Sequence, residues 1–281
     1  MFLKKIRKKL SDIVYGEERW IDRNGNFRQR AARGLVPRSQ YCYGMLRAAD
    51  QAKYFGIGKV KVLEFGVASG AGLLNMIRLA ELIQEETGVE FDIVGFDACD
   101  GLPAVKGYRD HAELWVDGDF SMKDRAGLLD RIDGRARIIF GDISDTIEGF
   151  TAELSSDLPI GFISVDVDIY TATVSAFRCL TSSPENYLPA TGMYFDDTMF
   201  YFANKWAGEL LAINEFNAES KMRKIDKDRS LFRAQSRHHE AWYSAMYVLH
   251  ILDHPIRNYG VTRASLDLEK HYKLMRSNFL L

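Results

Sequence analysis

The residues best suited to chemistry are two pairs of aspartates, each directly after a short apolar run. Asp166 and Asp168 follow one run, and Asp196 and Asp197 follow the next. Short apolar runs indicate buried strands, and neighbouring parallel strands bring their carboxyl ends to one crevice. In a pleat, Asp166 and Asp168 point the same way, so their carboxylates repel unless a cation or solvent relieves them. Acids are common at loop ends, but both pairs together predict an oxygen site for Mg²⁺, Mn²⁺ or Ca²⁺.

A second feature with chemical meaning is the spacing Glu64-x-Gly66-x-x-x-Gly70. The pattern begins at the end of an apolar run, Val60–Glu64, and is followed by a segment with helical periodicity. A strand, a glycine turn and a helix in this order let the backbone approach a ligand and point free helix N–H groups at it. Ala68 stands where the dinucleotide fingerprint GxGxxG requires its second glycine, which argues against a dinucleotide site. From these residues alone, other nucleotide-like ligands stay open.

The elements that would position these residues alternate between short strands and amphipathic helices, which is typical of a doubly wound α/β sheet. The expected strands are Val60–Glu64, Phe91–Phe96, Arg135–Phe140, Leu158–Val165, Gly192–Phe195, Met222–Asp226 and Trp242–Ile251. The expected helices are Ser39–Tyr54, Gly72–Thr87, Met122–Ile132, Ile147–Leu154, Thr171–Leu180 and Asn204–Ala218. The expected loops include Asp22–Gly34, Ser182–Thr191 and Gly107–Asp119, the last of which we expect to fold over a ligand.

Two further acids stand at the ends of expected strands. Asp97 ends the second strand, where nucleotide-binding sheets hold a ribose diol; the alternative is a simple turn aspartate. Asp142, followed by Ile143, comes after the third strand in a Gly-Asp turn, which by itself carries little information.

The spacing at 64–70 resembles motif I of the class I S-adenosylmethionine (SAM) methyltransferases. FDACDGLP at 96–103 is similar to the FDSFEGLP signature of the macrocin-type sugar and macrolide O-methyltransferases. DVDIYTAT at 166–173 is similar to the DGDLYEST motif of the same family, and the resemblance covers residues 59–254. The clearest departures from the two patterns are Ala98, Cys99, Val167, Thr171 and Ala172, whereas Asp100 keeps the acid of the first pattern.

The resemblance implies a Rossmann-like, seven-stranded, mostly parallel sheet with an antiparallel last strand, preceded by an N-terminal helical extension. It also implies SAM as cofactor and a divalent cation such as Mg²⁺. The implied cofactor contacts are Glu64, Gly66, Ala68, Ser69, Gly70, Asp97, Asp142 and Ile143. The implied cation ligands are Asp166, Asp196 and Asp197, and Asp168 matches the general base proposed for the family.

These patterns predict a SAM-dependent O-methyltransferase (EC 2.1.1) that acts on a hydroxyl of a sugar or a glycosylated small molecule. A cation that holds the hydroxyl lowers its pKa, and a carboxylate such as Asp168 accepts the proton. Two alternatives stay open: a metal-independent small-molecule methyltransferase, and a non-catalytic SAM-fold protein for binding or assembly. His238 and His239 are expected in a surface loop, with a role as base or substrate ligand as the alternative.

Composition sets the broad class. Of the 281 residues, 47% are hydrophobic and 27% are charged, as expected for a globular protein with one large α/β domain. The three cysteines form no CxxC pair, so neither a zinc site nor a disulfide framework is indicated, and we expect a cytoplasmic location. No apolar run is long enough to span a bilayer. We expect a small-molecule or carbohydrate substrate, no nucleic acid, and a homo-oligomer.

Charge is distributed unevenly. Residues 1–40 hold eleven Lys and Arg against four Asp and Glu, a net of +7 that leaves −9 for the rest of the chain. Residues 1–14 have the pattern of a basic amphipathic helix, which can contact an anionic membrane peripherally. Docking on its own domain or on a partner subunit is the preferred interpretation. The expected organisation is a basic extension at 1–58, a methyltransferase domain at 59–255 and a tail at 256–281.

Overall fold

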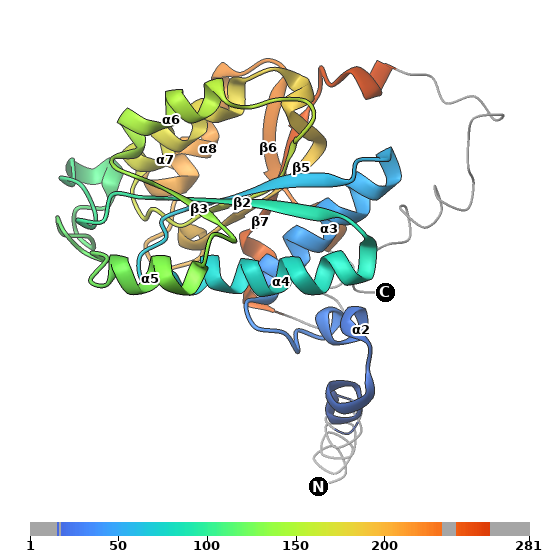
Figure 1. Ribbon diagram of the computed structural model, residues 1–281. Coiled ribbons are helices and arrows are strands. Elements are labelled where there is room, and N and C mark those ends of the chain that lie inside the picture. Colours follow the sequence, from blue (N-terminus) through green and yellow to red (C-terminus); the bar gives the residue numbers. More distant parts are fainter. Residues whose placement is uncertain (1–15, 17, 232–239, 259–281) are drawn as a thin grey trace, which may run out of the picture.

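The apolar runs pair into a seven-stranded sheet in the computed structural model, which describes residues 16, 18–231 and 240–258 (Figure 1). The order across the sheet is β3-β2-β1-β4-β5-β7-β6. All six residues of β4 are buried, as expected for a central strand covered on both faces. The strands are β1 (Lys59–Phe65), β2 (Glu90–Asp97), β3 (Arg137–Phe140), β4 (Ile160–Val165), β5 (Tyr187–Phe195), β6 (Arg223–Lys227) and β7 (Met246–Ile251).

The strand directions agree with the predicted fold class. β1 pairs in parallel with β2 and β4, β2 with β3, and β4 with β5. β7, the last strand in the chain, runs antiparallel to both β5 and β6. The prediction of a Rossmann-like, mostly parallel sheet is therefore confirmed. The strand order reverses between β1 and β4, and open α/β sheets bind ligands at the carboxyl ends of strands at such a reversal.

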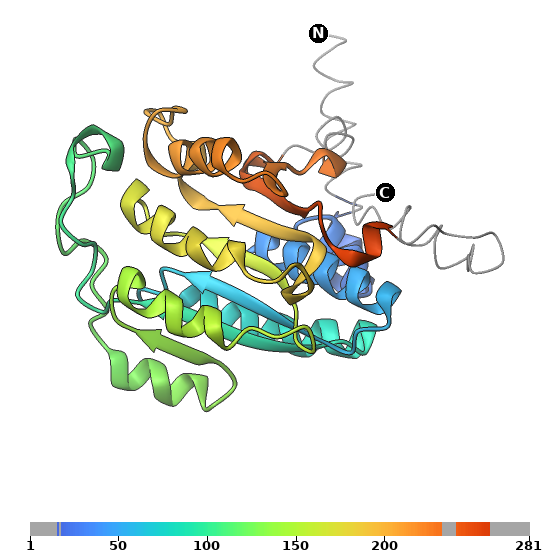
Figure 2. The same ribbon diagram turned by 90° about the horizontal axis from the view of Figure 1, so that it is seen from above.

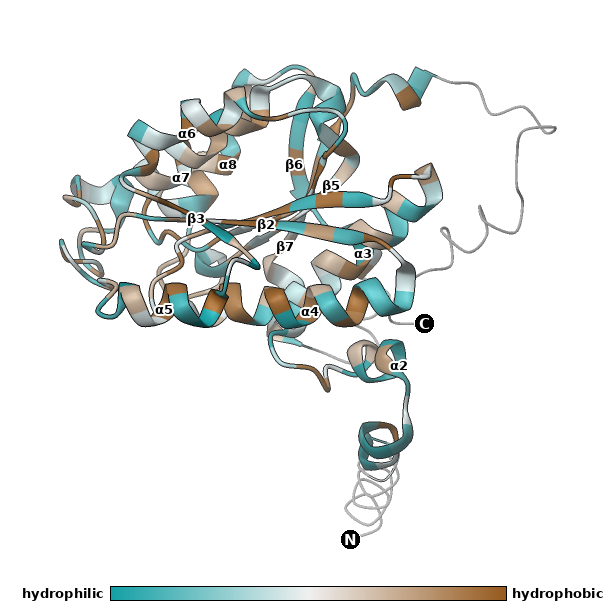
Figure 3. Cartoon of the chain, in the orientation of Figure 1, coloured by the Kyte–Doolittle hydropathy of each residue, from teal (hydrophilic) through white to brown (hydrophobic). Residues whose placement is uncertain are grey.

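Helices cover both faces of the sheet, and those on one face lie side by side in Figure 2. β1 separates two apolar cores, with Val60 and Val62 in one core and Leu63 and Phe65 in the other. Figure 3 shows apolar residues along the strands and in alternating bands along α4. One face carries α3 (Ser39–Phe55), α4 (Ala71–Thr87) and α5 (Arg125–Ile132), with α2 (Phe27–Ala32) beside α3, and the other carries α6 (Ile143–Ala152), α7 (Tyr170–Phe177) and α8 (Gly208–Glu219).

The segment Asp22–Gly34 contains the helix α2, so the prediction of a loop there was wrong. The side chain of Asn26 accepts a hydrogen bond from the backbone N–H of Gln29 (2.9 Å), and the Gln29 side chain accepts one from the backbone N–H of Asn26 (2.9 Å). Arg28 then pairs with one acid of α3 and one of α4. The polar composition of this segment indicated a loop. The reciprocal cap between Asn26 and Gln29 nevertheless allows a helix to begin there.

The segment Ser182–Thr191 was also predicted as a loop, but β5 begins at Tyr187. Pro189 lies inside the strand, in the stretch where the register between β4 and β5 shifts. A proline is tolerated at such an irregularity because its missing N–H is not needed for the ladder. The carboxyl end of the strand is Phe195, as predicted.

Some predictions concern residues outside those that the structure describes: the basic segment 1–14, the pair His238 and His239, and residues 259–281 of the tail. Among the described residues, no helix is both long enough and apolar enough to cross a membrane. The division into extension, domain and tail stays a prediction. Within the predicted extension, α3 packs against β4 and β5.

Candidate active site

A cavity of about 620 Å³ lies at the carboxyl ends of the parallel strands, where β1 and β4 are neighbours. Gly66 and Ala68 of the turn after β1 form part of its lining. The aspartates that follow β4 and β5 form another part, and all four members of the two predicted pairs line the cavity. This volume is in the range of small-molecule sites. The predicted meeting of the glycine turn and the four acids in one crevice is therefore confirmed.

The turn after β1 has a backbone conformation that favours glycine. Gly66 and Gly70 have φ angles of +87° and +84°, and Ala68 between them has +46°. A Cβ atom on Gly66 would lie 1.7 Å from the carbonyl oxygen of Asp166, so the chains that leave β1 and β4 are in contact here. Glycine alone allows both this contact and this φ angle. Ser69 lines a smaller neighbouring cavity instead, and Gly70 packs against α5.

Asp97, at the end of β2, fixes the shape of this turn. Its Oδ2 accepts hydrogen bonds from the N–H groups of Val67 (3.0 Å) and Ala68 (2.7 Å). Its Oδ1 accepts one from the N–H of Cys99 (2.6 Å). Asp97 also lines the cavity, and carboxylate oxygens have further lone pairs for a ligand. The ribose contact stays a prediction, and the backbone contacts are those expected of the alternative, a turn aspartate.

Glu64 is buried beneath the turn, with 2% of its surface exposed. Its Oε1 accepts a hydrogen bond from the Tyr41 hydroxyl (2.8 Å), and its Oε2 has no hydrogen-bond partner among the described residues. Burial raises the pKa of Glu64 to about 8. Buried acceptors in native proteins nearly always have a partner, so the unused oxygen favours a ligand that donates a hydrogen bond there.

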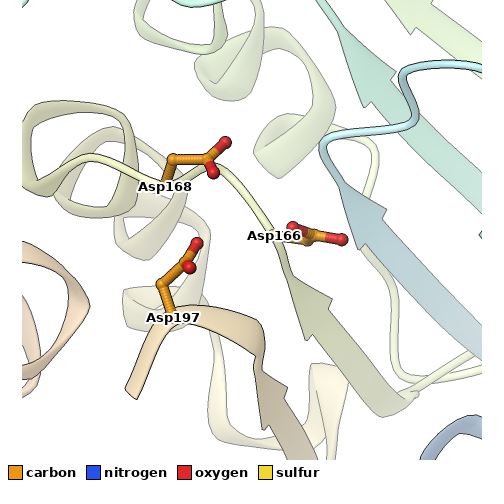
Figure 4. A group of neighbouring side chains, drawn as sticks. All are labelled: Asp166, Asp168 and Asp197. Carbon is orange, nitrogen blue, oxygen red and sulfur yellow. The ribbon is translucent and has the colours of Figure 1, made fainter. Parts of the chain in front are cut away.

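Three of the four aspartates form a group, shown in Figure 4. Asp166, Asp168 and Asp197 each place one oxygen within 4.8 Å of the oxygens of the other two. Asp168 and Asp197 face each other, and the Asp166 side chain is turned towards β1 (Figure 4). The carboxylates of two neighbouring strand ends thus converge beside the glycine turn.

A bend in the chain, and not the pleat of a strand, brings Asp166 and Asp168 into this group. β4 ends at Val165, before both acids, so the prediction that the pleat aligns them was wrong. Asp168 has a φ angle of +61°, and the N–H of Ile169 donates to the carbonyl oxygen of Val167 (2.6 Å). This bond between residues two apart closes a γ-turn around Asp168, a conformation that is rare and strained. Strain of this kind is concentrated at functional sites.

Asp196 lines the same cavity but lies outside the group of three. The Tyr194 hydroxyl donates a hydrogen bond to its Oδ1. The predicted cation ligands include Asp196. The group in the structure contains Asp168 in its place. The roles of both residues stay predictions.

Burial and mutual repulsion raise the pKa values of the group. Burial, followed by the charges of Asp196 and Asp197, raises the pKa of Asp166 to about 7. Burial and the neighbouring carboxylates also raise the pKa values of Asp168 and Asp197. Oδ2 of Asp197 is buried and has no hydrogen-bond partner among the described residues. A divalent cation would offset both the repulsion and the loss of solvent, and an all-carboxylate donor set fits Mg²⁺, Mn²⁺ or Ca²⁺.

Glu209, in the first turn of α8, is a fifth acid that the sequence reasoning missed. It is fully buried, and its Oε2 accepts a hydrogen bond from the backbone N–H of Asp197 (3.0 Å). Its Oε1 has no partner among the described residues, and burial raises the pKa of Glu209 well above its ordinary value. The one available signal was an acid at the start of an apolar helix, which is common at helix N-termini and does not identify a site.

The loop Gly107–Asp119 contributes Trp115 and Asp119 to the cavity lining, and its folding over a ligand stays a prediction. Asp110 is buried and accepts hydrogen bonds from the N–H groups of Lys106 (2.8 Å) and Thr171 (2.9 Å), which joins the loop to the start of α7. His111 is buried against Phe200 of the loop that follows β5. Other residues between β2 and α5 also line the cavity: Ala98, Gly101, Leu102, Pro103, Ala104, Lys106 and Phe120.

The turn after β3 supplies the remaining predicted residues. Asp142 and Ile143 line the cavity together with Ser144. Oδ1 of Asp142 accepts a hydrogen bond from the N–H of Ser144 (2.7 Å) and so caps α6. α6 begins at Ile143, earlier than predicted, because of this cap. The contact of these residues with an adenine ring stays a prediction.

No protein-family model matches the chain, and no curated protein matches it. Among solved structures, it is similar to CalS11, described as a calicheamicin methyltransferase, with 20% identity, 72% of this chain and 82% of that chain covered, and a TM-score of 0.48. It is also similar to the O-methyltransferase NovP, with 14% identity, coverages of 75% and 79%, and a TM-score of 0.49. An O-methyltransferase from Bacillus cereus in complex with SAH gives 13% identity, coverages of 76% and 82%, and a TM-score of 0.40. Identities this low leave function to be argued from the site itself.

Proposed function

We propose that this protein is a SAM-dependent O-methyltransferase that acts on a hydroxyl of a sugar or a glycosylated small molecule, with the help of a divalent cation. The observation that carries the proposal is that one cavity joins the glycine turn to the carboxylate group. A methyl donor over the turn and an acceptor hydroxyl at the acids would then be adjacent. Transfer between two bound molecules depends largely on such orientation.

The donor, when bound, supplies the methyl group, and residues around the turn would hold it. Gly66 and Ala68 let the backbone approach the ligand, and the unused oxygen of Glu64 is an acceptor for its amino group. We propose that Asp97 holds the ribose and that Asp142 and Ile143 contact the adenine, because all three line the same cavity.

Asp166, Asp168 and Asp197 are the cation ligands that we propose, since their oxygens already lie within 4.8 Å of one another. A divalent cation there supplies a Lewis acid that lowers the pKa of an acceptor hydroxyl. The carboxylate oxygens of the group that are left free accept the hydroxyl proton. This assignment makes Asp168 a ligand and Asp196 a partner of Tyr194, in contrast to the assignment implied by the family resemblance.

The first test is binding and product formation with the whole chain. Calorimetric titration with S-adenosylhomocysteine (SAH) should show a single site, and incubation with SAM and candidate glycosides should give a product heavier by one methyl group in mass spectrometry. A chain that binds SAH but methylates none of the acceptors would favour the non-catalytic alternative. A chain that binds no SAH would contradict the proposal.

The second test concerns the cation. We expect EDTA to abolish methyl transfer and Mg²⁺ or Mn²⁺ to restore it. Asp168→Asn and Asp197→Asn should each weaken Mn²⁺ binding by at least about tenfold, because each removes one of few charged ligands. Asp196→Asn should weaken it less, and Asp157→Asn, a change at an exposed acid far from the cavity lining, should leave it unchanged.

Full activity in EDTA would support the metal-independent alternative. Strong loss of Mn²⁺ binding in Asp196→Asn, with little loss in Asp168→Asn, would restore Asp196 as a ligand and Asp168 as the base.

A further inference from the structure

The segment between β2 and α5 brings three side chains to the cavity that neither the proposed donor contacts nor the proposed cation ligands include: Lys106, Trp115 and Phe120. Among the described residues that line the cavity, Lys106 is the single one with a positive charge. Lys106 is exposed, and within the described part of the chain its ammonium group has no acid within ion-pair distance. A cation that the protein itself does not pair is free to bind an anionic ligand.

Trp115 carries a polar group without a protein partner. Its Nε1 is buried, and no described residue accepts a hydrogen bond from it. Buried indole N–H groups usually have an acceptor, because an unpaired buried donor is costly. The ring of Phe120 packs edge to face against the indole, with 5.9 Å between the ring centres. A buried donor that lines the cavity and lacks a protein partner indicates an oxygen atom of a bound molecule.

The backbone holds the positions of Lys106 and Trp115 in the same part of this segment. The N–H of Val105 donates to Oδ1 of Asp117 (2.9 Å), which ties the chain next to Lys106 to the chain just after Trp115. The carboxylate of Asp110, which is fully buried, accepts from the backbone N–H of Lys106 (2.8 Å). The ammonium group and the indole N–H therefore reach one cavity from neighbouring stretches of a fixed backbone.

The other charged residues of the cavity lining are all aspartates. They are Asp97, Asp119, Asp142, Asp166, Asp168, Asp196 and Asp197. The acids at the ends of β4 and β5 would face the cation and the positively charged methyl donor of the proposed function, which offset their charge. An anionic group bound at Lys106 is then not repelled by an uncompensated cluster, and Lys106 is the lining residue that attracts it.

We propose that Lys106 and Trp115 bind a negatively charged group, a phosphate or a carboxylate, on the sugar acceptor. The inference rests on the proposed function and narrows its substrate class to anionic sugars. Lys106 supplies the opposite charge, and the indole N–H of Trp115 donates a hydrogen bond to an oxygen of the same group. Phe120, with 56% of its surface exposed, offers an apolar surface to the sugar ring beside it.

The test compares matched pairs of sugars on the whole chain, saturated with SAH and Mg²⁺. Glucose 1-phosphate is paired with glucose, and methyl glucuronide with methyl glucoside, so that the first pair probes a phosphate and the second a carboxylate. By calorimetry, the anionic member of at least one pair should bind at least about tenfold more tightly than its neutral partner. The pair with this preference identifies the anionic group.

Variants assign the preference to the two residues. Lys106→Gln should reduce it to less than about threefold, and Trp115→Phe, which keeps an aromatic ring but lacks the N–H, should weaken the anionic sugar by about fivefold or more. Both variants should keep the Kd of SAH within about twofold of the wild type, because neither residue contacts the donor. Lys53→Gln removes the same charge from an exposed position of α3, away from the cavity lining, and should change none of these constants.

Equal binding of the two members of both pairs, or no binding of either anionic sugar, would overturn the inference and leave the donor site of the proposed function standing. A preference for anions that survives Lys106→Gln would overturn it as well, because the added Mg²⁺ would then hold the anion. Weaker binding of SAH by Trp115→Phe would place the indole against the donor and contradict its role towards the acceptor. A wild-type chain that binds no SAH would overturn both the inference and the proposed function.

Discussion

Glu64 is a buried acid, and its Oε2 accepts no hydrogen bond from the described residues. Its pKa is raised by burial from an ordinary 4.5 to about 8, so the folded chain favours the protonated form and the unfolded chain ionises earlier. The contribution of protonated Glu64 to stability is complete below pH 4.5 and is lost as the pH rises towards 8. This residue therefore makes the ligand-free protein less stable in the range where the proposed donor would bind.

Glu64→Gln should remove that dependence. We expect the free energy of unfolding of the wild type to fall, relative to the variant, by up to about 1.4 kcal/mol per pH unit between pH 5 and pH 8. Denaturant titrations without ligand at several pH values measure the difference, and subtracting the two curves cancels the other acids. Parallel curves would show that Glu64 is ionised in the fold. The same variant should bind SAH more weakly, because glutamine cannot ionise, whereas Glu64 can lose its proton when an amino group binds.

Glu209 acts on the site through Asp197. Removing its carboxylate in Glu209→Ala leaves the N–H of Asp197 buried without its acceptor, so the Asp197 side chain loses its fixed position. We expect Mn²⁺ binding, followed by electron paramagnetic resonance, to weaken by about tenfold or more, as found for residues that orient metal ligands.

Glu209→Gln is the matched control, because its amide oxygen still accepts from Asp197. Mn²⁺ binding close to that of the wild type in Glu209→Gln supports a positioning role through this hydrogen bond. Equal loss in both variants would show instead that the charge of Glu209 takes part in binding the cation.

At the scale of elements, the contact between the turns after β1 and β4 is the critical one. Gly66→Ala would place a methyl group 1.7 Å from the Asp166 carbonyl oxygen at a φ angle of +87°. Gly88→Ala, at the end of α4, has a similar φ of +79° but nothing within 4 Å. Gly88→Ala should cost about 1–2 kcal/mol of unfolding free energy, and Gly66→Ala more than about 4 kcal/mol or no folded protein.

Thermal and denaturant unfolding of the two glycine variants gives the comparison. If both lose the same amount, then φ alone matters and the two turns can separate without cost. A stable Gly66→Ala chain that still binds SAH would contradict the view that this contact joins the donor site to the acids.

The sequence predicted the elements on which the site depends more reliably than the details within it. β4 and β5 end at Val165 and Phe195, where their apolar runs end, because burial on both faces leaves a pattern in the sequence. The bend at Asp168 left no such pattern, since a positive φ is uncommon even for an aspartate and no glycine marks the position.

Site residues that are distant in sequence could not be predicted, for a different reason. Tyr41 and Glu209 meet the site only because α3 and α8 pack on opposite faces of the sheet. Nothing in their local sequence records that meeting. The helix α2 was not predicted because its segment is polar in composition. The start of β5 was not predicted because Pro189 suggested a loop.

For the whole molecule, ligand binding should be visible as stabilisation. A ligand that binds only the folded chain adds about 2.7 kcal/mol at 100 times its Kd, which for a domain of this size corresponds to a rise in Tm of about 5–10 °C. We expect this rise with SAH and no rise with NAD, because Ala68 breaks the dinucleotide pattern. A rise with NAD, or none with SAH, would contradict the assignment of the glycine turn. Membrane contact through residues 1–14 and assembly into homo-oligomers stay predictions.

The insertion of β7 between β5 and β6 has a consequence for how the chain is made. β6 has no neighbour in the sheet except β7, so neither can join before residue 251 has left the ribosome. Until then, β5 offers an open edge right beside the aspartates that follow it. The nascent chain must therefore keep this unpaired edge protected while residues 196–251 are synthesised, and a premature stop between β5 and β7 releases a protein with that edge exposed.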